Sequence, residues 1–246
     1  MPDLMTSTAL AGQNTVSQFQ FSGQQVAELT STEYTLAGLA VDLSSSVGPF
    51  TKELEKAYAA VVKACRRSPR AHNLLLRGAT FNDAVRELHG FVELSRLQED
   101  QTTFAPNGMT ALYDGALDAI EAVETYGRYL TAKDFFVNGI VVIVTDGAEN
   151  RSRTATIRKI KEALARIARA EQLESIKTIL IGIGDSSVVQ AGLEQFRKDA
   201  GLDQFLWVGD ATPGRLAKMA EFISKSISSA SLSLGTGGPS QNLGLN

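Results

Sequence analysis

The chain has 246 residues, a formal net charge of −3 and a single cysteine, Cys65. This length is enough for one sizeable core, and the small net charge argues against general attraction to nucleic acid or to anionic membranes. One cysteine excludes an internal disulfide framework and a cysteine-based zinc site. The N-terminus has neither the basic start nor the apolar core of a secretory signal, and no apolar run approaches the ~20 residues that span a bilayer. We therefore expect a single, soluble, cytoplasmic domain.

The first part of the chain changes character near Tyr34. Residues 1–33 are rich in Ser, Thr, Gln and Gly and predict a polar N-terminal tail with at most one short strand. From Tyr34 onward, short apolar runs alternate with helical segments that carry one apolar stripe. This alternation is typical of βαβ units in a largely parallel sheet with helices on both faces. Residues 35–43 predict the first strand, and a helix follows Pro49.

The next segment predicts a hairpin at one edge of the sheet. Residues 73–81 and 85–94 have strand patterns and are joined by the turn residues Asn82 and Asp83. A hairpin makes one strand antiparallel, so the sheet is expected to be mixed. The later predicted elements are a helix after Thr110, a central strand at 138–147, a helix at 157–167, strands at 176–184 and 204–209, and a last helix at 216–227.

These elements predict a Rossmann-like, doubly wound α/β fold. Its sheet has six strands that are mostly parallel, with one antiparallel edge strand and helices on both faces. We place the domain at residues 34–229 and a flexible C-terminal tail at 230–246, because the closing stretch is rich in Ser and Gly.

Oxygen-bearing side chains gather where the predicted strands end. Asp42, Ser44 and Ser46 follow the first strand, Thr110 precedes a helix, and Asp146 ends the central strand. In an open α/β sheet, ligands bind beyond the carboxyl ends of the strands, beside the point where strand order reverses. A set of hydroxyls and carboxylates without His or Cys suits a hard cation such as Mg²⁺, and Mn²⁺ or Ca²⁺ also accept oxygen ligands.

Spacing and charge make this set suitable for one ion. Residues two apart in an extended segment point to the same side, so Asp42, Ser44 and Ser46 are expected to face one point. Two carboxylates just neutralise a divalent cation and leave it a strong Lewis acid toward a further ligand. A third carboxylate is therefore expected from outside the chain.

Each residue also has a purely structural interpretation. Ser44 or Ser46 could cap the helix that follows, Thr110 could cap another, and Asp-Gly at Asp146 is a common turn. Their joint occurrence at the strand ends of one predicted sheet favours the metal site.

These motifs resemble the von Willebrand factor type A (VWA) domain, whose metal-ion-dependent adhesion site is abbreviated MIDAS. The sequence DLSSS at residues 42–46 matches the family pattern Asp-x-Ser-x-Ser, NGMT supplies Thr110, and VTDG supplies Asp146. The resemblance covers about Tyr34 to Ser229. Met109 stands where many relatives have a second glycine. Among relatives, the chain is similar to small stand-alone bacterial proteins, including those of tellurite-resistance and stress clusters.

The resemblance implies a role for each matched residue. Ser44, Ser46 and Thr110 would bind the metal through hydroxyls, and Asp42 and Asp146 directly or through water. In the family, a Glu or Asp of a partner protein often completes the coordination, and metal binding can be coupled to movement of the last helix. Two further residues, Glu149 and Asn150, either line the rim of the site or belong to a solvated loop.

We expect a metal-dependent protein–protein interaction module, within an intracellular bacterial stress or assembly system and without enzymatic activity. One alternative is a structural or assembly subunit that binds through its tails and helix faces. A second is a phosphohydrolase with an aspartyl-phosphate at Asp42, but that chemistry needs an acid two residues later, where Ser44 stands. The basic helix from Arg151 to Arg169 is more simply a solvated face than a nucleic-acid surface.

Overall fold

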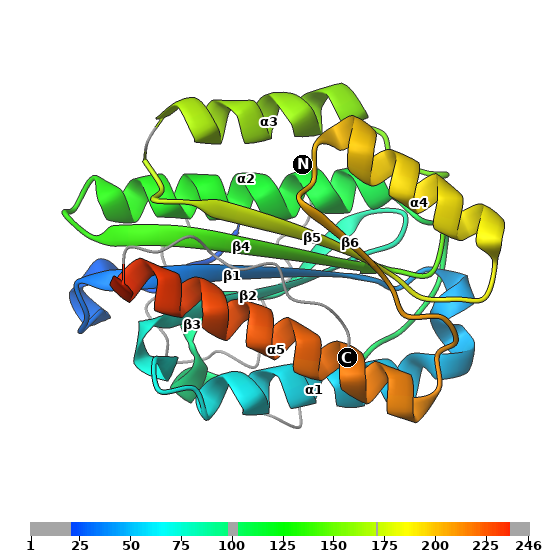
Figure 1. The fold of residues 1–246 in the computed structure, drawn as a ribbon, viewed down its shortest axis with the longest axis horizontal. Coiled ribbons are helices and arrows are strands. Elements are labelled where there is room, and N and C mark those ends of the chain that lie inside the picture. Colours follow the sequence, from blue (N-terminus) through cyan, green and yellow to red (C-terminus); the bar gives the residue numbers. More distant parts are fainter. Residues whose placement is uncertain (1–20, 98–102, 171, 237–246) are drawn as a thin grey trace.

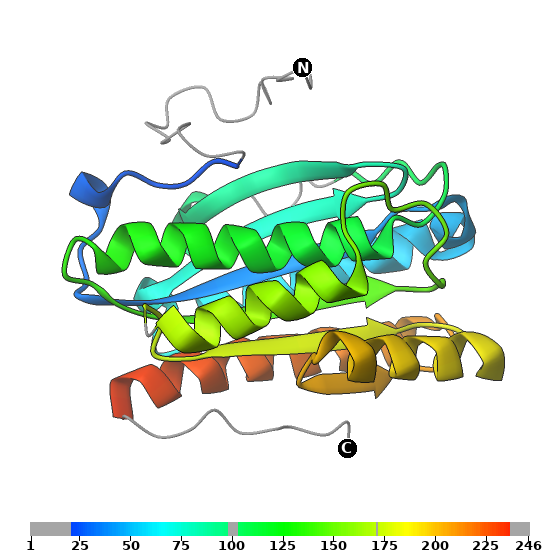
Figure 2. The ribbon, with the colours of Figure 1, turned by 90° about the horizontal axis from the view of Figure 1, so that it is seen from above.

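The computed structural model describes residues 21–97, 103–170 and 172–236. It shows one sheet between two layers of helices (Figures 1 and 2). The strands are β1 Glu33–Asp42, β2 Leu74–Phe81, β3 Val85–Glu93, β4 Phe136–Thr145, β5 Ile176–Gly182 and β6 Gln204–Trp207. The helices are α1 Thr51–Arg66, α2 Leu112–Thr131, α3 Ile157–Ala170, α4 Ser187–Ala200 and α5 Pro213–Thr236. Most of the predicted N-terminal tail and the last ten residues lie outside the described ranges.

The sheet has the strand order β3-β2-β1-β4-β5-β6, and only β3 is antiparallel to its neighbour. The predicted α/β fold, with a mostly parallel six-stranded sheet and one antiparallel edge strand, is confirmed. From β1 the chain continues to β2 on one side and later returns to β4 on the other side. Strand order therefore reverses between β1 and β4, which is where such sheets bind ligands.

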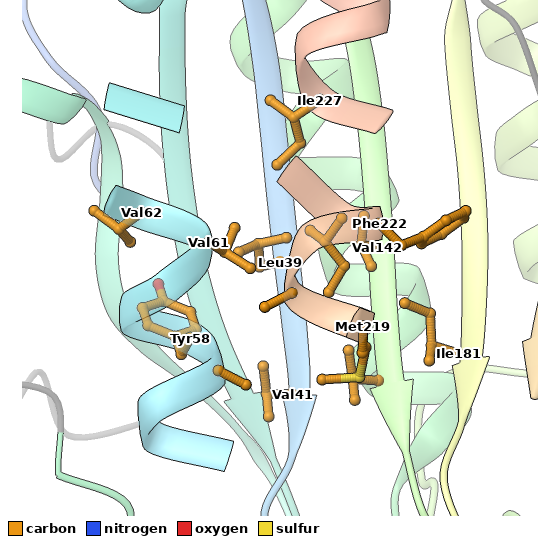
Figure 3. Packing of buried hydrophobic residues seen from close by; sticks show 14 of the residues in the cluster. Leu39, Val41, Tyr58, Val61, Val62, Val142, Ile181, Met219, Phe222 and Ile227 are labelled. Atoms are coloured by element: carbon orange, nitrogen blue, oxygen red, sulfur yellow. The ribbon is translucent and has the colours of Figure 1, made fainter. Parts of the chain in front are cut away.

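Both faces of the sheet are buried under helices. Leu39 and Val41 of β1 pack with α1 and α5, as Figure 3 shows, whereas Leu36 and Ala40 face α2 on the other side. This alternation follows from the twofold side-chain period of a strand. Because helices cover both sides, the central strands are apolar almost throughout. Among the described residues, no helix is long and apolar enough to cross a membrane.

Helix α4 has no counterpart among the elements predicted from the sequence. Its signals are nevertheless present in the sequence: the Ser186 hydroxyl accepts a hydrogen bond from the Val189 amide, and Gly201 follows the helix with a left-handed φ of 76°. Ser at the N-cap and Gly after the C-terminus are common boundaries of helices. Leu193 and Phe196, both buried, form its apolar face.

The ordered structure extends past both ends of the predicted domain. Helix α5 continues to Thr236, beyond the boundary at residue 229, because Asn138 Nδ2 donates to the Ala230 carbonyl at 2.7 Å and Arg70 Nε donates to Ser231 Oγ at 3.2 Å. At the other end, Gly23 pairs with Phe91 at the edge of β3. Contacts with buried strands therefore override the polar, Ser-rich composition of these segments.

A buried polar pair under β2 depends on a glycine. Tyr58 Oη lies 2.7 Å from His89 Nε2, and His89 Nδ1 lies 3.0 Å from the Gly90 carbonyl oxygen. A carbonyl only accepts, so Nδ1 carries the proton and Nε2 accepts from Tyr58. Burial lowers the pKa of His89 to about 4, which keeps the ring neutral. A Cβ at Gly78 would lie 2.1 Å from Tyr58 Oη and 2.9 Å from His89 Nε2.

Gly78→Ala is therefore expected to destabilise the protein by about 1–3 kcal/mol, because the added methyl forces the buried pair apart. The matched control is Gly192→Ala on the exposed side of α4, where a Cβ meets nothing within 4 Å. That change should stabilise by about 0.5–1 kcal/mol, since alanine loses less backbone entropy in a helix. Urea denaturation measures both, and equal effects of the two variants would contradict the prediction.

Candidate functional site

The predicted site residues come from three loops at one edge of the sheet. Asp42 is the last residue of β1, and Asp146 follows β4, its neighbour in the sheet. Thr110 lies just before α2, in the segment that returns from the β3 edge. The carboxyl ends of β1 and β4 flank the point where strand order reverses, so the two carboxylates meet at the expected location.

Asp42 is buried, with 1% of its surface exposed, and both of its oxygens accept hydrogen bonds. Oδ1 accepts from the Ser44 amide at 2.8 Å, and Oδ2 accepts from the Thr145 hydroxyl at 2.6 Å. The Thr145 hydroxyl also accepts from the Gly147 amide at 3.2 Å. Thr145 thus orients Asp42 and shapes the turn that contains Asp146, a role that was not predicted from the sequence.

A chain of side-chain contacts connects the two sides of the site. Ser44 Oγ lies 3.0 Å from Ser46 Oγ, and Ser46 Oγ donates to Asp146 Oδ1 at 2.9 Å. The expected reason for this arrangement was wrong, because the segment is not extended throughout: a 3₁₀ helix begins at Ser45. Ser44 itself is extended (φ −64°, ψ 166°), and the turn after it brings the two hydroxyls together.

The capping alternatives are not what the structure shows. Ser44 occupies the N-cap position of the 3₁₀ helix but makes no side-chain capping bond. The N-cap position of α2 is Ala111, so Thr110 does not cap that helix. Neither hydroxyl therefore caps a helix.

Asn150 fixes the position of Thr110. The Thr110 amide donates to Asn150 Oδ1 at 2.8 Å, and the Asn150 amide donates to the Thr110 carbonyl at 3.1 Å. A Cβ added at Gly147 would lie 3.3 Å from Thr110 Oγ1, so the Thr110 hydroxyl is next to the turn after Asp146. Of the two rim candidates, Asn150 thus positions a predicted ligand.

The other rim candidate, Glu149, ties the same loop to the start of α2. Its carboxylate accepts from the amides of Tyr113 at 2.9 Å and Arg151 at 2.7 Å. Further along the same loop, the amides of Arg153 and Ala155 donate to Asp114 of α2, at 2.9 Å and 2.6 Å. Because these carboxylates satisfy the backbone of residues 151–155, the loop is held in one position relative to the site.

The charges of the site are not balanced within the described residues. Burial raises the pKa of Asp42 to about 6, against the opposing effect of its hydrogen bonds, and burial also raises the pKa of Asp146. Among the described residues, no group of three or more His, Cys, Asp or Glu side chains is arranged to hold a metal ion. The donors at this site are therefore two carboxylates and three hydroxyls, all hard oxygens, a set that fits a hard divalent cation.

No protein-family model matches the sequence, and no curated protein matches it. Similar solved structures include the PilB minor pilin from Streptococcus sanguinis, with TM-score 0.54 and 14% identity over 81% of this chain and 62% of that one. Proximal thread matrix protein 1 from the mussel byssus, with a zinc-occupied MIDAS motif, has TM-score 0.51 and 18% identity over 79% and 46%. The ArnB paralog VWA2 from Sulfolobus acidocaldarius has TM-score 0.50 and 12% identity over 80% and 46%.

These comparisons define a class of fold. The chain has a VWA-like α/β fold, and its likeness to the neighbours, at under 20% identity, concerns that fold alone. The chain spans less than two thirds of the length of each of these three proteins.

Asp42→Asn is expected to stabilise the metal-free protein at pH 7.5. Asn can accept from the Ser44 amide through Oδ1 and donate to Thr145 through Nδ2, while Thr145 donates to the Gly147 carbonyl 3.0 Å away. The pKa of Asp42 is about 6 in the folded protein, above the ordinary aspartate value of 3.8, so the fold binds this proton more tightly than the unfolded chain does. Wild-type stability is therefore lost as pH rises from 3.8 to about 6, and the neutral variant avoids this loss.

The expected gain is about 1–3 kcal/mol above pH 6, with little difference between the proteins below pH 4. Chemical denaturation in chelator across pH 3.5–8 measures it. A variant that is less stable than wild type at pH 7.5 would show that the Asp42 charge is not a cost to the fold.

Asn150→Ala should destabilise the fold by about 1 kcal/mol, because the buried Thr110 amide loses its acceptor. Asn150→Asp keeps the acceptor oxygen and serves as the conservative control. Hydrogen–deuterium exchange of the Thr110 amide should be faster in the alanine variant and close to wild type in the aspartate variant. Unchanged protection in Asn150→Ala would mean that this contact does not hold the Thr110 loop.

Proposed function

We propose that the chain is a metal-dependent protein–protein interaction module. The observation that carries this proposal is the set of contacts from Asp42 through Ser44 and Ser46 to Asp146, with Thr110 held beside them. These five residues would hold the cation. When bound, a divalent cation offers a Lewis-acid position that a Glu or Asp of a partner protein can occupy.

Mg²⁺ is the proposed ion, with Mn²⁺ and Ca²⁺ as alternatives. Hydroxyl and carboxylate oxygens are the ligands that all three ions prefer. The mussel-byssus neighbour has zinc in its MIDAS motif, so Zn²⁺ belongs among the metals to be compared in any binding experiment.

We propose that the protein is not an enzyme. An aspartyl-phosphate mechanism at Asp42 would need a general acid, and the hydroxyl of Ser44 stands two residues later instead. A phosphatase activity of the wild type that disappears in Asp42→Asn would favour the hydrolase instead.

For the biological setting, we propose a cytoplasmic bacterial stress or assembly system, in which the domain works within a larger complex. This part rests on the resemblance to small stand-alone bacterial VWA proteins. One structural neighbour is a minor pilin, so cell fractionation has to decide the location. If the metal only stabilises the fold, the chain would instead be a structural or assembly subunit that binds through its tails and helix faces.

The three consecutive serines allow a matched test of metal binding. Ser46→Ala removes a proposed ligand at an exposed position, whereas Ser45→Ala changes a neighbour that is also exposed and whose backbone amide donates to the Gly108 carbonyl. We expect Mg²⁺ or Mn²⁺ to raise the Tm of wild type and Ser45→Ala, and Ser46→Ala to bind the metal at least about tenfold more weakly. Calorimetric titration gives the affinities. Equal affinities of the two variants would exclude Ser46 as a ligand.

The same variants test the function. Affinity capture from native cell extract, in Mg²⁺ and in chelator, should retain a partner with wild type and Ser45→Ala in Mg²⁺ only. Capture of the same partner in chelator and with Ser46→Ala would contradict the ion-bridged interaction and favour the structural role.

A further inference from the structure

The charge of the chain is distributed unevenly. Residues 151–170 contain seven of the 24 lysines and arginines and one of the 27 acidic residues, so this segment carries +6 and the rest of the chain −9. Most of the segment is helix α3. A local excess of this size within an acidic protein creates a field that attracts one sign of partner to one face.

Part of this charge lies on the outer face of α3. Arg158, Lys161 and Arg169 are exposed and share one side of the helix, opposite the buried Ile160 and Ile167. We call these three residues the basic stripe. At 1.5 Å per residue, the stripe is about 16 Å long. Between Lys161 and Arg169 the same side of the helix carries Glu162, which is exposed, and Ala165, which is half-buried.

The charges of the basic stripe are largely uncompensated within the described residues. Lys161 and Arg169 form no ion pair with a described residue, and Arg158 has only a 3.9 Å contact with Glu162, in which both side chains are more than half exposed. Such exposed pairs contribute little. Arg166, on the flank of the helix, is different: Glu124 binds it at 2.6 Å.

The basic stripe starts at the same sheet edge as the candidate metal site. Helix α3 runs back along the sheet from the carboxyl ends of the strands, so its first turn lies at that edge (Figures 1 and 2). Only residues 147–156 separate Asp146 from α3, and Glu149 and Asp114 pin this loop to α2. The stripe therefore has a fixed position relative to the site.

We propose that the basic stripe binds an acidic segment of the same partner protein whose carboxylate completes the metal site. This inference rests on the proposed function and names the chemistry of its partner: a polypeptide with one Glu or Asp for the ion and further acidic residues for Arg158, Lys161 and Arg169. The combination favours a polypeptide, because both positions take carboxylates. A nucleic acid would find only a short row of three cations for its phosphates.

The test uses two short fluorescent peptides and measures anisotropy in Mg²⁺. One peptide has a single Glu among Gly and Ser, and the other has several further Glu residues after the same Glu. Wild type should bind the acidic peptide about tenfold more tightly at about 50 mM salt, and this advantage should shrink at higher ionic strength. The triple variant Arg158→Glu, Lys161→Glu and Arg169→Glu should bind both peptides equally.

A matched triple variant controls for net charge. Lys56→Glu, Lys63→Glu and Arg67→Glu change the charge by the same amount at exposed positions on or next to α1, which covers the opposite face of the sheet. This control should keep the advantage of the acidic peptide. Circular dichroism checks that all variants are folded.

The outcomes separate this inference from the proposed function. If the α3 variant keeps the advantage of the acidic peptide, the basic stripe is not its binding surface, even where metal-dependent binding of the single-Glu peptide persists. If the single-Glu peptide binds equally in chelator, the proposed function itself fails. A single-stranded oligonucleotide that binds the stripe more tightly than the acidic peptide, independently of metal, would overturn the choice of a polypeptide.

Discussion

The hydrogen bond from Thr145 to Asp42 joins the ends of the two strands between which strand order reverses. It is 2.6 Å long and both residues are buried, so it fixes the carboxylate where water cannot compete. The same hydroxyl accepts from the Gly147 amide and so shapes the turn that presents Asp146. The relative position of the two carboxylates therefore depends on one threonine side chain.

The Asp42 carboxylate is held in an environment that opposes its charge. Two hydrogen bonds offset part of the cost of burial, yet the pKa remains raised to about 6. A fold selected only for stability would place a neutral residue at this position. Sites where buried charge lacks a compensating partner are commonly functional, and the surrounding hydroxyls are ligands of the kind that a hard cation takes, as we propose for this site.

The strands, and the grouping of the proposed ligands at one edge of the sheet, could be predicted because both depend on local patterns. Long apolar runs identify parallel strands, and the strand order places their polar ends together. The roles of Thr145 and Asn150 could not be predicted, since each acts on a residue about 40 or more positions away in the chain. Helix α5 was predicted too short for a related reason: Ala230 and Ser231 are buried against distant residues, although their local composition is typical of a tail.

Charge links the site to the helix beside it. Without a cation, the carboxylates of Asp42 and Asp146 repel an acidic partner at the edge where α3 begins. In the proposed complex a divalent cation would offset these two charges, and the exposed cations of α3 would then favour an acidic partner. Metal binding would thus remove a repulsion as well as add a ligand position. Because both effects act on the same approaching carboxylates, metal could control association without any movement of the fold.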